Sequence, residues 1–259
     1  MGFPKTSGKH ADPAVIEPAQ VIEERKKEGL HPTGPVADGA ILCYDAALWQ
    51  GVGTLPGRVA CDGWLEGAYL LPHADRWILA MKVAGWGAPT AVMALEELIA
   101  SGVPRFVSVG AAGGLQEALS VGEVIVCDRA IRDEGTSYHY LPPSREVAAT
   151  PEVVAAIEAT FKEHQIAYRL TKTWTTDAFF RETHEKVQLR RSEGCLTVEM
   201  EAAALFAVAQ FRQVRIGQIL YSGDYLGGEY WDNRAWNDRW EIRKQLVSLS
   251  AEICLRLTC

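Results

Sequence analysis

Residues 105–114 read Arg-Phe-Val-Ser-Val-Gly-Ala-Ala-Gly-Gly, an apolar run that passes directly into a glycine-rich segment. The apolar run predicts a buried strand over residues 105–109. The small residues after it predict a loop that exposes backbone amides and lets a ligand approach closely. A tight turn that needs glycine explains the same residues without a ligand. The segment lacks the Gly-Lys-Ser/Thr of a P-loop and the spacing of a dinucleotide-binding fingerprint.

The same kind of strand recurs on both sides of this stretch. Further apolar runs bounded by Gly, Pro or Asp predict strands at residues 40–44, 77–83, 123–127 and 216–221. Helical spacing of apolar residues predicts helices that include residues 92–99, 154–161 and 242–257. Thr150 and Pro151 provide an N-cap and a first-turn proline for the second helix. This alternation predicts an α/β fold, a three-layer α/β/α sandwich with a mixed central sheet, in which ligands bind beyond the carboxyl ends of strands.

The N-terminal segment has a different character from the rest. Residues 1–35 are charged and interrupted by prolines, which predicts an arm with one short helix near residues 15–27. No linker or shift of composition divides the remaining sequence. We therefore expect residues 36–259 to form a single domain.

Composition excludes several classes of protein. The 259 residues are 48% hydrophobic and 23% charged, as is typical of a soluble globular protein. The net charge is −7 and basic residues do not cluster, so no nucleic acid is expected as a partner. No apolar run reaches the roughly 18 residues of a membrane span, and the first twenty residues contain no secretory segment. Six scattered cysteines without metal-type spacing fit a cytoplasmic location.

Residues 198–204 read Val-Glu-Met-Glu-Ala-Ala-Ala and contain two carboxylates in an otherwise apolar stretch. We expect them to open a helix, so that Glu199 and Glu201 point to different faces and one of them is buried. A buried carboxylate needs hydrogen-bond donors, and the adjacent hydroxyl groups of a ribose would provide them. Alternatively, both residues simply favour a helix N-terminus through the helix dipole.

Three further features are candidates for function, each with a plain structural alternative. Asp224 follows the predicted strand at residues 216–221, where it is either a general acid or a turn or helix cap. Phe179 and Phe180 could stack on a planar ring, or they belong to the core. Residues 230–240 are rich in tryptophan and form either a lid over a ligand or a packed crossover.

Together these segments resemble the nucleoside phosphorylase superfamily, which includes hexameric purine nucleoside phosphorylases, uridine phosphorylases and methylthioadenosine nucleosidases. The resemblance extends over about residues 40–257, and residues 198–204 match the family's ribose-binding Val-Glu-Met-Glu-Ala motif. It implies that Met200 and Glu201 contact the sugar, with Glu201 binding the 2′- and 3′-hydroxyl groups. Phe179 is then placed beside base and ribose, and Asp224 is the acid that protonates N7 of a purine.

The sequence departs from the family at the phosphate site. Phosphorolytic members have Pro-Gly-Asp-Pro-x-Arg after the first strand, whereas Tyr44 and Leu48 here replace the glycine and the arginine. Ser108 stands in place of a second arginine, and Ala111 replaces a hydroxyl residue. Loss of these groups removes about 4–7 kcal/mol of anion binding, or about three to five decades of affinity. The candidate phosphate or anion region therefore comprises Tyr44, Ser108, Gly110 and Ala111.

The resemblance implies an enzyme that cleaves the N-glycosidic bond of a nucleoside through an oxocarbenium-like transition state. We expect phosphorolysis to free base and ribose 1-phosphate, with a purine favoured over uridine because Asp224 has a use only on a base with N7. Hydrolysis is the alternative, with Asp45 as the candidate base for water. A nucleoside-binding protein with degraded catalysis is the second alternative. The expected partners are a nucleoside and inorganic phosphate, the expected assembly is a homo-oligomer, and no metal or organic cofactor is implied.

Overall fold

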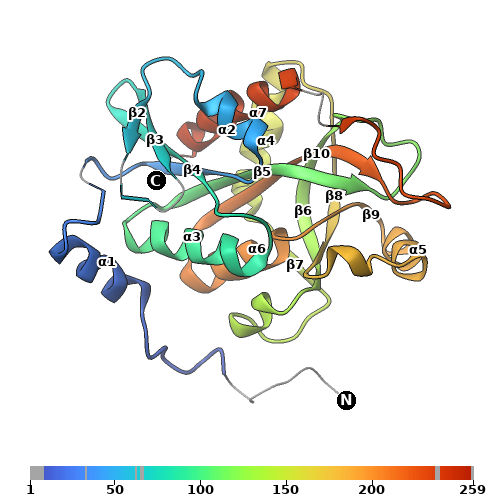
Figure 1. Cartoon of the computed structure of the whole chain (residues 1–259), viewed down its shortest axis with the longest axis horizontal. Coiled ribbons are helices and arrows are strands. Elements are labelled where there is room, and N and C mark those ends of the chain that lie inside the picture. Colours follow the sequence, from blue (N-terminus) through green and yellow to red (C-terminus); the bar gives the residue numbers. More distant parts are fainter. Residues whose placement is uncertain (1–8, 33, 62, 65–66, 237–239, 258–259) are drawn as a thin grey trace.

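The structure is a computed structural model that describes residues 9–32, 34–61, 63–64, 67–236 and 240–257. A mixed β-sheet forms its centre (Figure 1). Its strands are β1 (Gly39–Cys43), β2 (Val59–Cys61), β3 (Ala68–His73), β4 (Arg76–Lys82), β5 (Arg105–Gly114), β6 (Val124–Asp133), β7 (Glu146–Ala148), β8 (Tyr168–Thr176), β9 (Cys195–Glu199) and β10 (Arg215–Tyr225). The helices are α1 (Pro18–Lys27), α2 (Ala46–Val52), α3 (Ala88–Ala100), α4 (Pro151–Glu163), α5 (His184–Ser192), α6 (Ala202–Arg212) and α7 (Trp240–Arg256), with short 3-10 turns η1 (Thr136–His139) and η2 (Phe179–Arg181).

The strand pairing confirms the predicted mixed sheet. Strand β1 lies parallel between β4 and β5, and β3 and β2 extend that side in antiparallel pairing. On the other side, β5 pairs with β9, β9 with β8, β8 with β6, β6 with β10, and β10 again with β5. Five strands therefore close into a ring, a barrel-like half of the sheet that the sequence pattern did not indicate.

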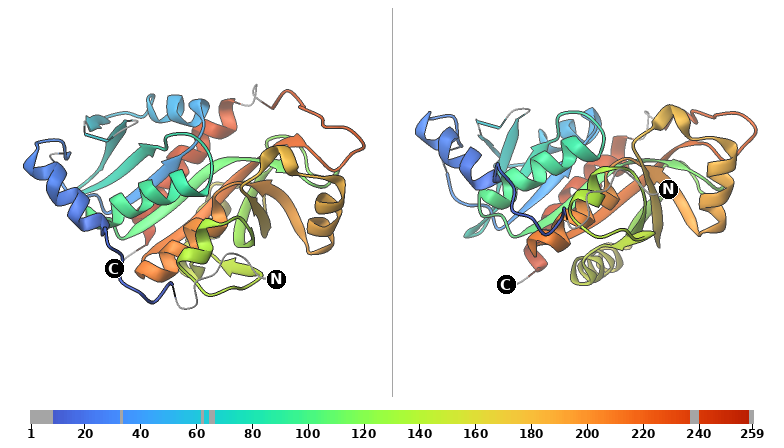
Figure 2. Two further views of the ribbon diagram at one scale, coloured as in Figure 1. Left: turned by 60° about the horizontal axis from the view of Figure 1, so that its bottom comes forward. Right: turned by 90° about the horizontal axis from the view of Figure 1, so that it is seen from below.

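Helices cover both faces of the sheet, which confirms the α/β fold. Helices α3 and α6 pack together on one face, whereas α7 packs with α2 and α4 on the other (Figures 1 and 2). Every residue of β1 is buried, as expected for a central strand with helices on both sides. Helix α6 is buried over its first eight residues, most of them alanine, so that it lies close to the sheet.

The predicted elements are found, but several strands are longer than their apolar runs. Strand β5 continues through the glycine segment to Gly114, and β10 continues past Tyr221 to Tyr225. The prediction of a loop at residues 110–114 is therefore wrong, because pairing between β5 and β10 persists as far as Gly114 and Tyr225. Small residues in this part of the sheet leave open the space that larger side chains would fill.

Close backbone packing explains two local features around α4. A Cβ atom on Gly217 would lie 2.6 Å from Val153 Cγ1, so glycine lets β10 approach this helix. Thr150 occupies the predicted N-cap position, and Pro151 follows it. The Thr150 hydroxyl oxygen does not cap its own helix but accepts a hydrogen bond from the Ile216 N–H at 3.0 Å. The start of α4 is therefore fastened to β10.

The N-terminal arm is attached to the same helical layer. Arg25 of α1 forms an ion pair of 2.7 Å with Glu97 of α3, and Arg212 of α6 lies 3.4 Å from Glu17. The arm thus runs along α3 and α6 (Figure 2). Within the described part of the chain, no helix is both long and apolar enough to cross a membrane.

Candidate active site

A cavity of about 340 Å³ lies where β1, β5, β9 and β10 end or carry small residues. It brings together eight of the nine residues that the sequence indicated, although they come from distant parts of the chain. These eight are Tyr44, Asp45, Gly110, Ala111, Phe179, Met200, Glu201 and Asp224. The ninth, Ser108, is fully buried and does not line the cavity.

The two carboxylates of residues 198–204 do not lie in the first turn of a helix, as the sequence had suggested. Glu199 is the last residue of β9, and Glu201 is the N-cap of α6, which begins at Ala202. Both side chains are buried, with 6% and 7% of their surface exposed. Both carboxylates therefore lie at the start of α6, as the helix-dipole alternative implies, but they are buried there.

Both carboxylate oxygens of Glu199 accept hydrogen bonds from the protein itself. One carboxylate oxygen accepts hydrogen bonds from the backbone N–H groups of Glu201 and Ala202, at 2.8 Å and 2.7 Å. The other accepts from the Thr175 hydroxyl of β8 at 2.6 Å. Glu199 thus satisfies the free amides at the start of α6 and ties this helix to a second strand.

Glu201 keeps acceptor capacity that the protein does not use. Its Oε1 accepts a hydrogen bond from the Gly87 N–H at 2.5 Å, and its Oε2 accepts from the Met200 N–H at 3.3 Å. A carboxylate has about four acceptor sites, so Glu201 has room for two more donors from the cavity. Burial raises the pKa of both glutamates, and the charge of Glu201 raises that of Glu199 further.

The turn before α3 fixes the position of Glu201. Gly87 has φ of 103°, a left-handed conformation that residues with a side chain rarely adopt, and its N–H faces Glu201. Pro89 follows in the first turn of α3, where a proline costs no hydrogen bond. The glycine and proline of this turn thus direct a backbone donor toward the buried carboxylate.

The cavity lining also combines aromatic rings with the carboxyl groups of Glu182 and Asp224. Trp231 Nε1 donates a hydrogen bond of 2.7 Å to Asp224 Oδ2, and Trp231 and Trp236 both line the cavity, which agrees with a lid. Phe179 and Phe180 meet edge to face, with their ring centroids 5.1 Å apart. They are 47% and 92% exposed, so the interpretation of this pair as core is wrong.

Glu182 also lines the cavity, and the sequence did not indicate it. It lies in the turn between η2 and α5. Burial, together with the charge of Asp224, raises the pKa of Glu182 to about 8, although Lys186 lowers it slightly. A lone glutamate in a polar stretch gives no sequence signal of its own, because its role depends on a partner on β10.

None of the four residues of the candidate anion region carries a positive charge. The Tyr44 ring is buried and lies against Gly110, where a Cβ atom would be 3.5 Å from Tyr44 Cδ2. Ser108 donates a hydrogen bond of 3.4 Å to the Tyr44 hydroxyl from beneath. Asp45 caps α2 by accepting from the Leu48 N–H at 2.8 Å, and it accepts from the Tyr221 hydroxyl at 2.5 Å.

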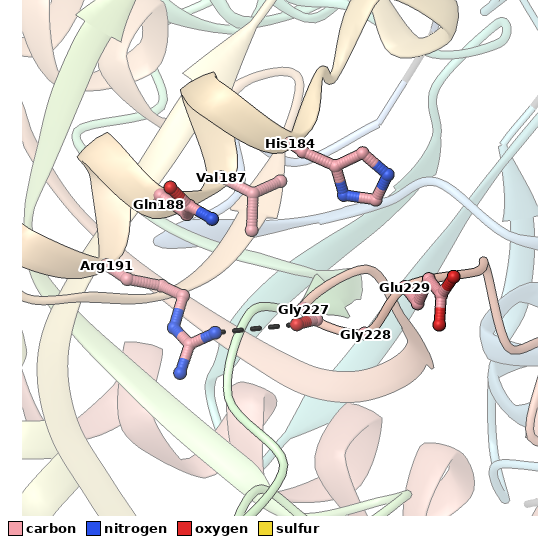
Figure 3. A pocket seen from close by; sticks show the side chains of 7 residues that line it. All are labelled: His184, Val187, Gln188, Arg191, Gly227, Gly228 and Glu229. Carbon is pink, nitrogen blue, oxygen red and sulfur yellow. Dashed lines mark hydrogen bonds between the residues drawn. The ribbon is translucent and has the colours of Figure 1, made fainter.

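Five carboxyl groups line the cavity, and no lysine, arginine or histidine of the described chain lines it. Nearby cations have other partners. Lys186 forms an ion pair of 3.1 Å with Asp133, and Arg234 donates to the Leu119 carbonyl at 2.6 Å. In a separate hollow of about 350 Å³, Arg191 of α5 reaches the Gly227 carbonyl at 3.4 Å (Figure 3). Arg239, in the tryptophan-rich segment, lies outside the described residues.

The family can now be assigned by comparison with known proteins. A sequence model described as the phosphorylase superfamily matches residues 69–257, which is most of the chain. The chain belongs to this superfamily. Of the strands around the cavity, β5, β9 and β10 lie within the matched region, whereas β1 and the residues that follow it precede this region.

Alignments with individual relatives cover a shorter part of the chain than the family model does. The chain is 35% identical over 145 residues to guanosine phosphorylase of Halorubrum lacusprofundi, covering 54% of this chain and 58% of that protein. It is 34% identical over 155 residues to uridine phosphorylase of Treponema pallidum, covering 55% of this chain and 59% of that protein. The aligned region therefore spans less than two thirds of either relative.

Solved structures show that the superfamily fold extends over nearly all of the chain. Uridine phosphorylase from Vibrio fischeri has a TM-score of 0.73 at 22% identity, covering 85% of this chain and 92% of that one. Purine nucleoside phosphorylase from Toxoplasma gondii has a TM-score of 0.71 at 20% identity, covering 84% and 92%. At these identities the likeness concerns the fold alone.

Proposed function

We propose that the protein cleaves the N-glycosidic bond of a nucleoside and releases the free base. The observation that carries the proposal is the arrangement of three groups in one cavity. Glu201 has unused acceptor sites beside Met200, Phe179 offers an aromatic face, and Asp224 provides a carboxyl group. A nucleoside presents the complementary groups, which are hydroxyl donors, a planar ring and ring nitrogens that can accept a proton.

The chemistry follows from these positions. Glu201 accepts the 2′- and 3′-hydroxyl groups and holds the sugar, and its negative charge stabilises the oxocarbenium-like transition state. Phe179 packs against the base. Asp224 supports protonation of the leaving base, which makes the departing nitrogen a better leaving group. A purine is favoured over uridine because only a purine offers N7 to this acid.

Phosphate is the first candidate acceptor, since the relatives are named phosphorylases. The product would then be ribose 1-phosphate, and a cation from a neighbouring subunit would complete the anion site. Water is a second candidate, favoured by the five carboxyl groups and by the lack of a basic side chain among the described residues that line the cavity. Asp45 is the candidate base for water, although its two oxygens already accept from Leu48 and Tyr221.

The test is base release from adenosine, guanosine, inosine and uridine, measured with and without phosphate, with the sugar product identified. Ribose 1-phosphate supports phosphorolysis, whereas free ribose at a phosphate-independent rate supports hydrolysis. Asp224→Asn should lower base release about 10²–10⁴-fold. Asp232→Asn, at an exposed carboxylate bound to Arg234, is the matched control and should leave the rate unchanged. Tight nucleoside binding without base release under any condition would instead indicate a binding protein.

A further inference from the structure

The lining of the cavity is rich in two kinds of side chain. Five carboxyl groups line it, together with the aromatic rings of Tyr44, Trp86, Phe179, Trp231 and Trp236. In the part of the chain that the structure describes, no lysine, arginine or histidine lines it. The cavity therefore offers negative charge and aromatic faces to the molecule that it binds.

The two kinds of side chain are neighbours in the cavity. Trp231 Nε1 donates a hydrogen bond of 2.7 Å to Asp224 Oδ2, so this indole lies beside the carboxylate. A Cβ atom on Gly223, the residue before Asp224, would lie 3.4 Å from the ring of Trp236. The charge of Asp224 also acts on Glu182, which lines the same cavity. A ligand that lies against these rings is therefore also close to carboxyl groups.

We propose that the cavity binds nucleosides whose base carries a fixed positive charge, such as a pyridinium ring or an N7-alkylated purine. The proposal rests on the proposed function and names the class of substrate for the same site. A base of this kind is planar, aromatic and cationic. The rings of the lining match the first two properties, and its carboxyl groups match the third.

Rings and carboxyl groups both attract an organic cation. A cation over the face of a tryptophan or phenylalanine ring is attracted by the ring electrons, most strongly where water is excluded. Carboxylates in one partly dehydrated cavity repel each other, and a positive ligand among them offsets this repulsion. The charge of Lys186 also reaches Glu182, but the Lys186 ammonium group is bound to Asp133 at 3.1 Å. A cationic base would thus supply the positive charge that the described lining lacks.

The carboxyl groups are not arranged for a metal ion. A metal needs several ligands that converge on one point at about 2.0–2.6 Å. Among the described residues, no group of three or more His, Cys, Asp or Glu side chains is placed to hold one. The oxygens of Glu199 already accept from Thr175 and from two backbone amides. Charges that are spread along an aromatic lining suit a flat cation whose charge is spread over a ring.

A cationic base also changes what the reaction requires. The C1′–N bond breaks with its electron pair going to the ring nitrogen, so the base leaves as a neutral molecule and takes up no proton. An oxygen of phosphate or water forms the new bond to C1′, and this acceptor releases its proton to the solvent as the ester or the alcohol forms. For such a substrate Asp224 contributes its charge rather than a proton.

Two C-ribosides that differ only in charge test the binding preference without turnover. One carries a 1-methylpyridinium ring joined to C1′ through ring carbon 3, and the other carries the isosteric 3-methylphenyl ring. In calorimetric titrations of the wild type, the Kd of the cation should be at least about tenfold lower than that of the neutral compound. Glu182→Gln removes a carboxyl group and Phe179→Leu removes a ring, and each should lower this ratio about threefold or more. Glu185→Gln removes the same charge outside the cavity and should leave the ratio unchanged.

Turnover provides a second measurement. The ribosides of pyridinium-3-carboxamide and pyridinium-3-carboxylate have the same ring and the same bond to C1′, but the carboxylate cancels the positive charge. The wild type should cleave the carboxamide with a kcat/KM at least about tenfold higher. Asp224→Asn should raise KM for the carboxamide more than it lowers kcat, because this leaving group needs no proton. With a neutral purine nucleoside the same variant should lower mainly kcat.

The results that would overturn the preference for a cation differ from those that would overturn the proposed function. A wild-type ratio below tenfold in either comparison refutes the preference, and so does a binding ratio that neither Glu182→Gln nor Phe179→Leu lowers. If Glu185→Gln lowers the ratio as far as Glu182→Gln does, the net charge of −7 is its cause and the role of the cavity is refuted. Cleavage of neutral nucleosides leaves the proposed function intact in each of these cases. If the wild type binds neither C-riboside and releases base from no nucleoside, the proposed function itself fails.

Discussion

The substitution Glu201→Gln tests how the sugar is held. The Gly87 N–H donates to Glu201 Oε1 at 2.5 Å, so the amide oxygen of glutamine must remain there, since an amide nitrogen would place two donors face to face. The amide NH2 group then points to the cavity, where the sugar hydroxyls need an acceptor. Two hydrogen bonds to a charged acceptor are lost, at about 1.5–3 kcal/mol each. The expected loss of affinity is about 10²–10⁴-fold.

Calorimetric titration with a C-nucleoside measures this loss without turnover, because the carbon–carbon linkage to the base is not cleaved. Glu199→Gln is the control, since the Glu199 carboxylate already binds Thr175 and two backbone amides; affinity should change less than about tenfold. A 2′,3′-dideoxy analogue should bind equally to the wild type and to Glu201→Gln. Two results would refute the role of Glu201 in binding the sugar hydroxyl groups. One is an equal loss of affinity in Glu199→Gln and Glu201→Gln. The other is a dideoxy analogue that binds the wild type more tightly than it binds Glu201→Gln.

Three further predictions concern stability and assembly. The pKa values of Glu199 and Glu201 are raised in the folded state, so the folded protein holds protons that the unfolded chain releases above about pH 4.5. The free energy of unfolding, measured with urea, should therefore fall from pH 5 to pH 8. In Glu199→Gln this fall should be smaller. Gly217→Ala places a Cβ atom 2.6 Å from Val153 Cγ1 and should cost about 1–3 kcal/mol of unfolding free energy, which the combined change with Val153→Ala should partly restore. Analytical ultracentrifugation should show a homo-oligomer, and a species of only 28.4 kDa at working concentration would contradict this.

Much of the fold was predictable because its signals are local. Apolar runs located β1, β4 and the first halves of β5 and β10, and Thr150 with Pro151 located the start of α4. The full length of β5 and β10 was not predictable, since the second half of each strand contains small or polar residues. These residues are strand because β5 and β10 pair with each other, and because Gly113 and Gly114 of β5 also pair with β9.

The candidate site, too, was predictable only where its signal is local in the sequence. The motif at residues 198–204 identified Glu201, but its local pattern predicted a helix where the structure has a strand end and an N-cap. The role of Glu199 depends on Thr175 from another strand, and that of Glu182 depends on Asp224. Contacts between distant segments of this kind leave no trace in spacing or composition.

The cavity is built from two kinds of structure, and this matters for altering the protein. Its floor consists of backbone from β5 and β10, and Gly113 there lies so close to Leu226 that a methyl group would collide with it. Phe179, Glu182 and Trp231, which also line the cavity, lie outside the long strands. Libraries that vary these three residues should therefore change which base is accepted while preserving expression, whereas diversity in the floor should yield mostly insoluble variants.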